Sequence, residues 1–243
     1  MRACLMLRPI PSSGILIDHR YFYINSGSRG HYSCGLARQA MIGFLRIHGE
    51  ERIFLGPEWL QTLESYKHNP SAIGFTVEQI IISRIASAGV ESDNFSIRPA
   101  KIVAFEGDST TILQDEEHAY YVPLKFNFKA IDALYVHLDQ KKKVVRLVAI
   151  QITVAKRHTD SEAAFYAGLA MWLHGLTAFE ITTEFLWIHE GQRGRVEVEE
   201  KIIKLRTKTH VNWPRHTVHW VSIEQVHKDL AAMLTKIRPL PVA

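Results

Sequence analysis

Three polar residues interrupt two stretches of the sequence that otherwise have the apolar character of buried strands. Asp132 lies within residues 130–137, and Gln151 and Thr153 lie within residues 144–154. Burying a carboxylate and an amide costs free energy unless each group has a polar partner. A carboxylate beside an amide oxygen suits a hard cation, because Mg²⁺ takes oxygen ligands and retains several waters. The residues therefore predict either a metal site or a structural pair of buried polar groups.

The polar segment between these two stretches predicts a hairpin turn. If the turn is centred between Lys141 and Lys142 and contains no bulge, Asp132 lies opposite Gln151. Their Cβ atoms would then be about 5.5 Å apart, as in cross-strand neighbours. Gln151 and Thr153 share one face of their strand, because side chains alternate along a strand.

A helix is predicted from Thr76 onward, ahead of the strands. Thr76 and Gln79 have the spacing of a capping box, and an apolar face follows them. Gly89 is the expected stop. Glu78 would lie in the first turn, where the helix dipole favours a carboxylate.

The rest of the sequence alternates between strand-like and helix-like runs. Strands are predicted at 101–105, 119–124, 130–137, 144–154, 179–188, 196–205 and 216–223, and helices at 161–173 and 224–237. This order predicts an α/β fold with a mixed central sheet flanked by helices. We expect residues 1–70 to form an N-terminal extension, a short strand and a helix packed on the core, and residues 71–243 to form the main α/β domain.

Composition places the 243-residue chain among ordinary globular proteins, since 47% of its residues are hydrophobic and 22% are charged. Disordered and collagen-like classes are thereby excluded, and two cysteines are too few for a disulfide scaffold or a Cys-based zinc site. The formal net charge of +4 is unevenly spread. Residues 1–120 carry 11 Lys+Arg and 13 Asp+Glu, whereas residues 121–243 carry 18 and 12. The C-terminal half is therefore the better candidate for contact with a polyanion.

Two runs of residues carry a resemblance to a known superfamily. They are residues 128–134, FKAIDAL, and residues 149–158, AIQITVAKRH. The runs resemble the core of the PD-(D/E)XK restriction-endonuclease-like superfamily and, more narrowly, the nuclease-like domains of Crinkler effectors and retrotransposon-hot-spot proteins. Those domains show an Asp and then a Gln-x-Thr-x-x-x-x-His pattern, preceded by a helix bearing Glu, which here is Glu78. The resemblance covers about residues 15–190 and implies a restriction-endonuclease-like fold.

What the resemblance implies is a metal-dependent site for phosphodiester hydrolysis in DNA. Asp132 would be the main ligand of Mg²⁺ or Mn²⁺, and Gln151 would stand in place of the superfamily's second acid. Glu78 would bind the ion through water or hold a second ion. Thr153 occupies the position of the expected catalytic lysine and cannot supply its positive charge. Lys156 is a candidate substitute, although strand alternation places it on the other face from Thr153.

The basic hairpin tip and one histidine are candidates for contact with DNA. Lys141, Lys142, Lys143 and His158 could contact phosphates; the alternatives are a solvated tip and a histidine that caps its segment. Members of the family often carry a P-loop NTPase domain, whereas this sequence has no Gly-x-x-x-x-Gly-Lys-[Ser/Thr] motif. An NTPase-domain partner and a homodimer are therefore further expectations.

The apolar runs of the sequence are all short. The N-terminal run is interrupted at Arg8-Pro9, before it reaches the length of a signal peptide core, and no run approaches the length of a membrane helix. We therefore expect an intracellular protein with no membrane partner, and the resemblance implies action in the nucleus.

Each candidate residue also has a purely structural interpretation. Asp132 could bond a loop, Gln151 and Thr153 could form a polar patch on an edge strand, and Glu78 could serve the helix dipole. Thr153 favours two alternatives to a nuclease. One is a catalytically degenerate relative that binds DNA, and the other is a protein-interaction effector module that keeps only the fold. The presence of Asp132, Gln151 and Glu78 favours the nuclease.

Overall fold

The computed structural model describes the sheet of this protein and the helices that cover it. The described residues are 22–24, 30–32, 63–64, 70–92, 94–105, 109–123, 128, 130–154, 161–191 and 216–237. The predicted strand at 196–205, most of the predicted N-terminal extension, Lys156 and His158 lie outside them. Within the extension, the short strands β1 (Phe22–Ile24) and β2 (Gly30–Tyr32) pair in the antiparallel direction.

Six strands form one mixed sheet in the order β10-β9-β8-β7-β6-β5. β6, β7 and β8 form an antiparallel meander, whereas β8, β9 and β10 are parallel, as are β5 and β6. The strands are β5 (Lys101–Phe105), β6 (His118–Pro123), β7 (Ala133–Asp139), β8 (Val144–Thr153), β9 (Glu180–His189) and β10 (Thr217–Ser222). The predicted α/β class with a mixed sheet is confirmed, and each strand predicted within the described residues forms with ends shifted by at most three residues.

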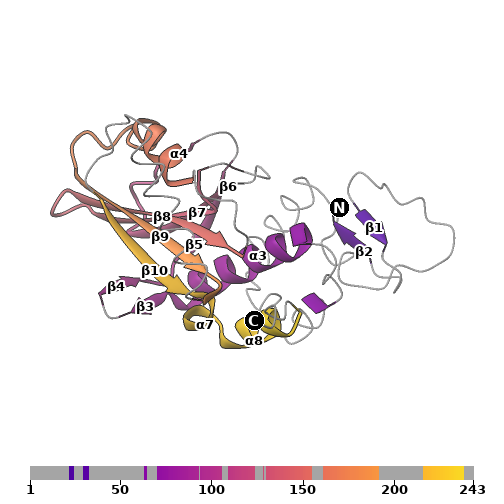
Figure 1. Cartoon of the computed structure of the whole chain (residues 1–243). Helices are drawn as coiled ribbons and strands as arrows, with labels where there is room; N and C mark the ends of the chain where they lie inside the picture. Colours follow the sequence, from indigo (N-terminus) through magenta and orange to yellow (C-terminus); the bar gives the residue numbers. More distant parts are fainter. Residues whose placement is uncertain are drawn as a thin grey trace.

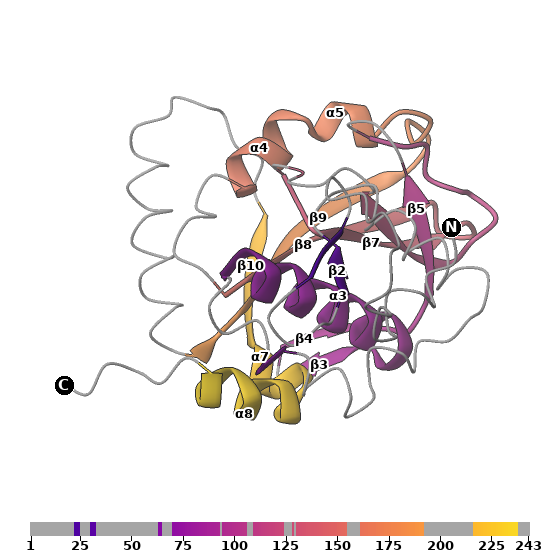
Figure 2. The same cartoon turned by 90° about the vertical axis from the view of Figure 1, so that its right-hand side faces the viewer.

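Helices cover both faces of the sheet, which gives this part of the chain three layers (Figure 1). Figure 2 shows α4 and α5 on one side of the sheet and α3, α7 and α8 on the other. The covering elements are α3 (Pro70–Ala88), the hairpin of β3 (Val90–Ser92) and β4 (Phe95–Ile97), α4 (Ser161–Ala167), α5 (Leu169–Trp172), α7 (Ile223–Val226) and α8 (Lys228–Ile237). None of the helices in the described ranges has both the length and the apolar character needed to cross a membrane.

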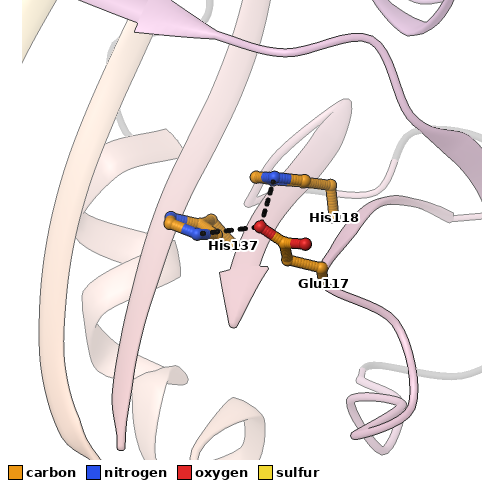
Figure 3. Close-up of side chains that lie close together, drawn as sticks. All are labelled: Glu117, His118 and His137. Atoms are coloured by element: carbon orange, nitrogen blue, oxygen red, sulfur yellow. Dashed lines mark ion pairs between the residues drawn. The ribbon is translucent and has the colours of Figure 1, made fainter. Parts of the chain in front are cut away.

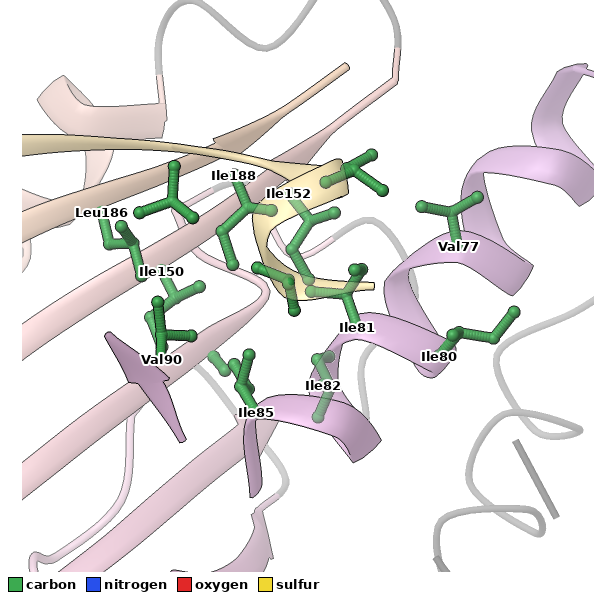
Figure 4. Close-up of a cluster of buried hydrophobic side chains, with 14 of the residues drawn as sticks. Val77, Ile80, Ile81, Ile82, Ile85, Val90, Ile150, Ile152, Leu186 and Ile188 are labelled. Carbon is green, nitrogen blue, oxygen red and sulfur yellow. The ribbon is translucent and has the colours of Figure 1, made fainter. Parts of the chain in front are cut away.

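Strand alternation divides the buried side chains into two cores. On β8, Val148, Ile150 and Ile152 point toward α3, whereas Leu147 and Ala149 point toward α4. Figure 4 shows the first core, where isoleucines of α3 pack against β8 and β9. Because both faces are covered, β8 is apolar almost throughout, as expected for a strand buried on both faces. Polar residues on this strand therefore stand out.

The predicted start of the first helix at Thr76 is wrong, because α3 begins at Pro70. Proline suits a first turn, where its fixed φ is helical and its missing N–H is not needed. The apolar face also begins earlier than predicted, since Ile73 and Val77 are fully buried. Thr76 is therefore a buried interior residue, and the first turn of α3 contains no acid, so Glu78 is not a first-turn carboxylate.

Two predicted helices are interrupted. The helix predicted at 161–173 divides at Gly168, whose N–H is shared between the carbonyls of Ala164 and Phe165 at 3.2 and 3.1 Å. The helix predicted at 224–237 divides at His227, which has an extended backbone with φ −154° and ψ 95°. Ser222 and Gln225 form a capping box that starts the shorter piece, α7. Tertiary packing thus shortens helices that sequence periodicity alone predicts as continuous.

Gly89 ends α3 as predicted, and it does so in a conformation that requires glycine. Its φ is +73°, and its N–H bonds the carbonyl of Ile85 at 2.8 Å. A Cβ at this position would collide with the carbonyl oxygen of Ile97 on β4. We expect Gly89→Ala to lower the free energy of unfolding by about 2 kcal/mol, because positive φ and the collision add. Urea denaturation measures this, with Gly175→Ala as the control for positive φ in open space.

Candidate functional site

Asp132 and Gln151 are in direct contact, on neighbouring strands of the meander. The N–H of Asp132 bonds the carbonyl of Ile150 at 2.9 Å, and Ala133 pairs with Ile150 in the β7–β8 register. The Gln151 amide Nε2 donates to Asp132 Oδ2 at 2.6 Å, and the N–H of Ile152 donates to the same oxygen at 2.7 Å. The predicted cross-strand placement of Asp132 and Gln151 is therefore confirmed.

The hairpin turn explains why this register forms. Asp139 Oδ1 accepts the N–H groups of Lys141 and Lys142 at 3.0 and 2.9 Å, and Lys143 adopts a φ of +54°. These bonds close the turn without a bulge, so every residue from Asp139 back to Ala133 pairs as the centred turn predicts. The hydrogen bond from the Lys142 N–H holds the pKa of Asp139 below its usual value, against the opposing effect of desolvation and with help from the charge of Lys142 and the Lys141 N–H.

The pair lies in a buried polar row on the α4-facing side of the sheet. Asp132, Gln151 and Thr153 are only 7%, 2% and 5% exposed. In register beside Gln151 and Thr153 on β9 lie Trp187 and His189, both also buried. Within the described residues, Gln151 Oε1 is a buried acceptor with no hydrogen bond. An acceptor buried without a bond is costly, so this oxygen is the atom of the pair that is open to a further ligand.

Glu78 belongs to the layer on the other side of the sheet. It lies on α3, whose buried residues pack with Ile150 and Ile152, whereas Gln151 points to the α4 face. One turn before Glu78, Gly74 approaches Val154, so α3 passes the end of β8 that carries Thr153. The predicted meeting of Glu78 with Asp132 and Gln151 would therefore have to occur around this end of β8, and it stays a prediction.

The lysine tip is far from the buried pair. Lys141, Lys142 and Lys143 are exposed at the end of the hairpin, nine or more residues from Asp132, or about 30 Å along an extended strand. Lys142 pairs with Asp139 at 3.6 Å, and the Lys143 ammonium lies 4.9 Å from the centre of the Phe179 ring. The lysine tip therefore cannot complete a site at Asp132, and its contact with DNA stays a prediction.

A second polar cluster, formed by Glu117, His118 and His137, was not predicted from the sequence (Figure 3). One ligand atom from each residue lies within 4.8 Å of the others. Among the described residues, these three form the one group of His, Cys, Asp or Glu side chains that could hold a metal ion. Glu117 Oε1 lies 3.3 Å from His118 Nε2 and 3.9 Å from His137 Nε2. These three residues can therefore hold a metal ion. The sequence shows a histidine in each of two strand-like runs, but it does not show that the two strands pair in a register that brings these histidines together.

The strands hold the histidines side by side. His118 and His137 are register partners on β6 and β7, and their rings stack with centres 4.5 Å apart. His118 Nδ1 is 2.8 Å from the hydroxyl of Tyr135. Burial, and then the charge of His137, keep the pKa of His118 below its usual value despite the opposing effect of Glu117. The lowered pKa favours the neutral imidazole of His118, which is the form that binds metals.

An ion-pair network lies next to the two histidines on the α3-facing side of the sheet, beginning at Arg146, the register partner of His137. Arg146 Nε and Nη2 donate to the two oxygens of Glu184 at 2.6 and 2.9 Å, and His219 Nε2 is 2.7 Å from Glu184 Oε2. The Phe95 ring lies beside both Arg146 and His219. Burial raises the pKa of Glu184, but the hydrogen bonds and charges of Arg146 and His219 together outweigh it, and the net pKa is below its usual value.

Comparisons with protein-family models, with curated proteins and with solved structures gave no match to this chain.

Proposed function

We propose that this protein is a nuclease-like protein of the PD-(D/E)XK type, which acts on DNA through a metal-dependent site for phosphodiester hydrolysis at Asp132 and Gln151. The observation that carries the proposal is the buried contact between the Asp132 carboxylate and the Gln151 amide. Both residues stand where the resemblance predicts a ligand pair. The order of a helix, a three-stranded meander, a helix and a parallel strand around them supports a restriction-endonuclease-like version of the mixed α/β fold.

The donor atoms of this pair fit a hard divalent cation. Asp132 offers carboxylate oxygens, and Gln151 Oε1 is buried without a hydrogen bond among the described residues. Oxygen ligands of this kind suit Mg²⁺ or Mn²⁺. When bound, such an ion supplies an activated water and stabilises the departing oxygen of the phosphodiester. An amide in place of a second carboxylate leaves one negative charge fewer at the site, so we expect weaker ion binding than two acids would give.

The chain itself fixes the position of the carboxylate. Two donors, the Ile152 N–H and the Gln151 amide, hold Asp132 Oδ2. Both donors come from β8, so the sheet takes part in fixing the orientation of the carboxylate. Support of this kind is what a site needs in order to hold a ligand with little reorganisation.

A catalytically degenerate relative is the second candidate, and Thr153 is the observation that favours it. Thr153 is 5% exposed and lies on the same face as Gln151, at the position where the resemblance predicts a lysine. A neutral hydroxyl cannot offset the charge that develops on the phosphate. This alternative is a protein that binds DNA, or another protein as an effector module, without cutting DNA.

A cleavage assay with plasmid DNA and Mg²⁺ or Mn²⁺ tests the proposal. We expect the wild-type protein to cut the plasmid, and Asp132→Asn to lower the rate by about 100-fold or more, since even indirect supports of a metal ligand matter 10- to 100-fold. Asp115→Asn, at an exposed aspartate, is the matched control and should cut like the wild type. If Asp132→Asn cuts the plasmid at the wild-type rate, Asp132 is not part of the cleavage site.

The same preparation separates the remaining candidates. DNA retention that weakens as salt rises, without cleavage, would replace the nuclease by the DNA-binding relative. If neither cleavage nor retention is observed, the protein-interaction module is the candidate that remains, and the proposal fails.

A further inference from the structure

We propose that Glu117, His118 and His137 form a binding site for a zinc-type transition-metal ion, at the end of the sheet where β6 begins and β7 ends. This site is separate from the pair at Asp132 and does not depend on the proposed nuclease function. Asp132 precedes β7, and His137 lies five residues further along, or about 17 Å away on an extended strand. The two sites also lie on opposite faces, because Tyr135 and His137 share the α3-facing side of β7.

The distances between the donor atoms are close to those of a zinc site. In a tetrahedral site with zinc–ligand bonds of about 2.0 Å, neighbouring donor atoms are about 3.3 Å apart. Glu117 Oε1 and His118 Nε2 are 3.3 Å apart, and Glu117 Oε1 and His137 Nε2 are 3.9 Å apart. The Glu117 side chain is 69% exposed, so it can close the longer distance without disturbing a packed core.

The backbone holds all three residues in place before any ion binds. His118 and His137 are paired in the β6–β7 register, and the Leu138 N–H bonds the carbonyl of Glu117 at 2.8 Å. All three residues are thus anchored to one antiparallel pair of strands. Preorganised ligands on a sheet lose little entropy when they bind an ion.

Tyr135 orients one of the imidazoles. Its hydroxyl is 2.8 Å from His118 Nδ1, which leaves Nε2 directed toward Glu117. A metal-bound histidine usually donates its second ring N–H to a polar partner, which fixes the tautomer. The Tyr135 hydroxyl can accept that hydrogen bond from Nδ1–H, and His118 Nε2 makes no hydrogen bond within the described residues. This nitrogen is therefore ready to bind an ion.

The ligand set selects the class of ion. Two imidazoles and one carboxylate suit Zn²⁺, Co²⁺, Ni²⁺ or Cu²⁺, whereas Mg²⁺ and Ca²⁺ prefer sites made of oxygen. Three protein ligands leave a fourth position for water or a small anion, as in zinc sites that are not purely structural. That position faces solvent, because the side chains of Glu117 and His137 are 69% and 36% exposed.

Nearby positive charge does not prevent ion binding. Arg146 is the register partner of His137, but both oxygens of Glu184 neutralise its guanidinium. Lys101 is paired with Glu116. Arg98 is exposed, so solvent screens its charge. The carboxylate of Glu117 lies 3.3 Å from His118 Nε2 and 3.9 Å from His137 Nε2, and its negative charge favours a cation.

Equilibrium dialysis and calorimetry with Zn²⁺, and visible absorption with Co²⁺, test this inference. We expect the wild-type protein to bind one more zinc ion than His137→Asn, and Glu117→Gln to weaken zinc binding by about 10-fold or more. His174→Asn, at an exposed histidine outside the cluster, is the matched control and should bind like the wild type. Circular dichroism of all variants checks that each is folded.

Equal zinc stoichiometry and affinity in the wild type and in folded His137→Asn would overturn the inference. The result is independent of the cleavage assay, because the readout is zinc bound and not DNA cut.

Discussion

Asp132→Ala is expected to lower the free energy of unfolding by about 3 kcal/mol, because it leaves two buried donors without an acceptor. The Ile152 N–H and the Gln151 amide both donate to Asp132 Oδ2. Gln151 is 2% exposed, so water cannot replace the lost acceptor without opening the sheet. The expected loss is therefore much larger than that of a surface substitution, which is usually within about 0.5 kcal/mol.

Asp132→Asn should preserve most of this stability, with a loss of less than about 1 kcal/mol. Asn keeps one oxygen at this position, and that oxygen can still accept both the Ile152 N–H and the Gln151 amide. Guanidinium denaturation compares both variants with Asp115→Ala at an exposed position. If Asp132→Ala costs under 1 kcal/mol, the pair is not the buried, interdependent unit described here. The asparagine variant separates loss of ion binding from loss of folding.

Glu184→Ala is the second change with a large expected effect, a loss of about 3 kcal/mol at pH 7, because it leaves a partly buried guanidinium unpaired. Arg146 makes two bonds to the Glu184 carboxylate, and His219 makes a third. The side chains of Arg146 and Glu184 are 26% and 17% exposed, so solvent recovers part of the loss. The expected loss in free energy of unfolding therefore lies at the lower end of the range for broken buried ion pairs.

The stabilisation that Glu184 gives to the fold should decrease as the pH falls. Its pKa in the folded protein is below its usual value, with Arg146 and His219 outweighing burial. A carboxylate with a depressed pKa stabilises the fold above its unfolded pKa of about 4.3, and this contribution disappears as the pH falls through the folded pKa. The difference in unfolding free energy between the wild type and Glu184→Ala should therefore shrink on acidification below about pH 4.3.

Urea denaturation between pH 7 and pH 3 measures this dependence. Glu180→Ala is the matched control, since Glu180 is an exposed glutamate on the same strand. Its substitution should change stability by less than about 0.5 kcal/mol at every pH. A difference for Glu184→Ala that stays constant down to pH 3 would contradict the role given to its ionised form.

The pairing of Asp132 with Gln151 could be predicted from the sequence because it depends on a local hairpin. The two residues are joined by a short turn, and Asp139 closes that turn without a bulge. With the turn fixed, the two-residue period of the strands sets every later pair. The faces of β8 followed from the same alternation. The role of the pair in ion binding and catalysis stays a prediction.

Helix ends were less predictable. The capping pattern at Thr76 and Gln79 was present in the sequence, yet both residues are buried inside α3. The apolar contacts of Ile73 and Val77 extend the helix back to Pro70 and outweigh a local capping preference of about 1 kcal/mol. Gly89 correctly predicted the end of α3, because this position requires a positive φ.

The sequence by itself determined the α/β class, the six strands of the main sheet, and the contact of Asp132 with Gln151. Only the tertiary structure decided that His118 meets His137 and that Glu184 meets Arg146 and His219. The arginine and the histidine reach Glu184 from positions 38 and 35 residues away in sequence. Alternation along a strand says which face a side chain occupies, but not which strand lies next to it. For Arg146 and Glu184 that choice depends on how α4 and α5, which lie between β8 and β9 in the chain, pack on the sheet, and this packing is a property of the tertiary structure.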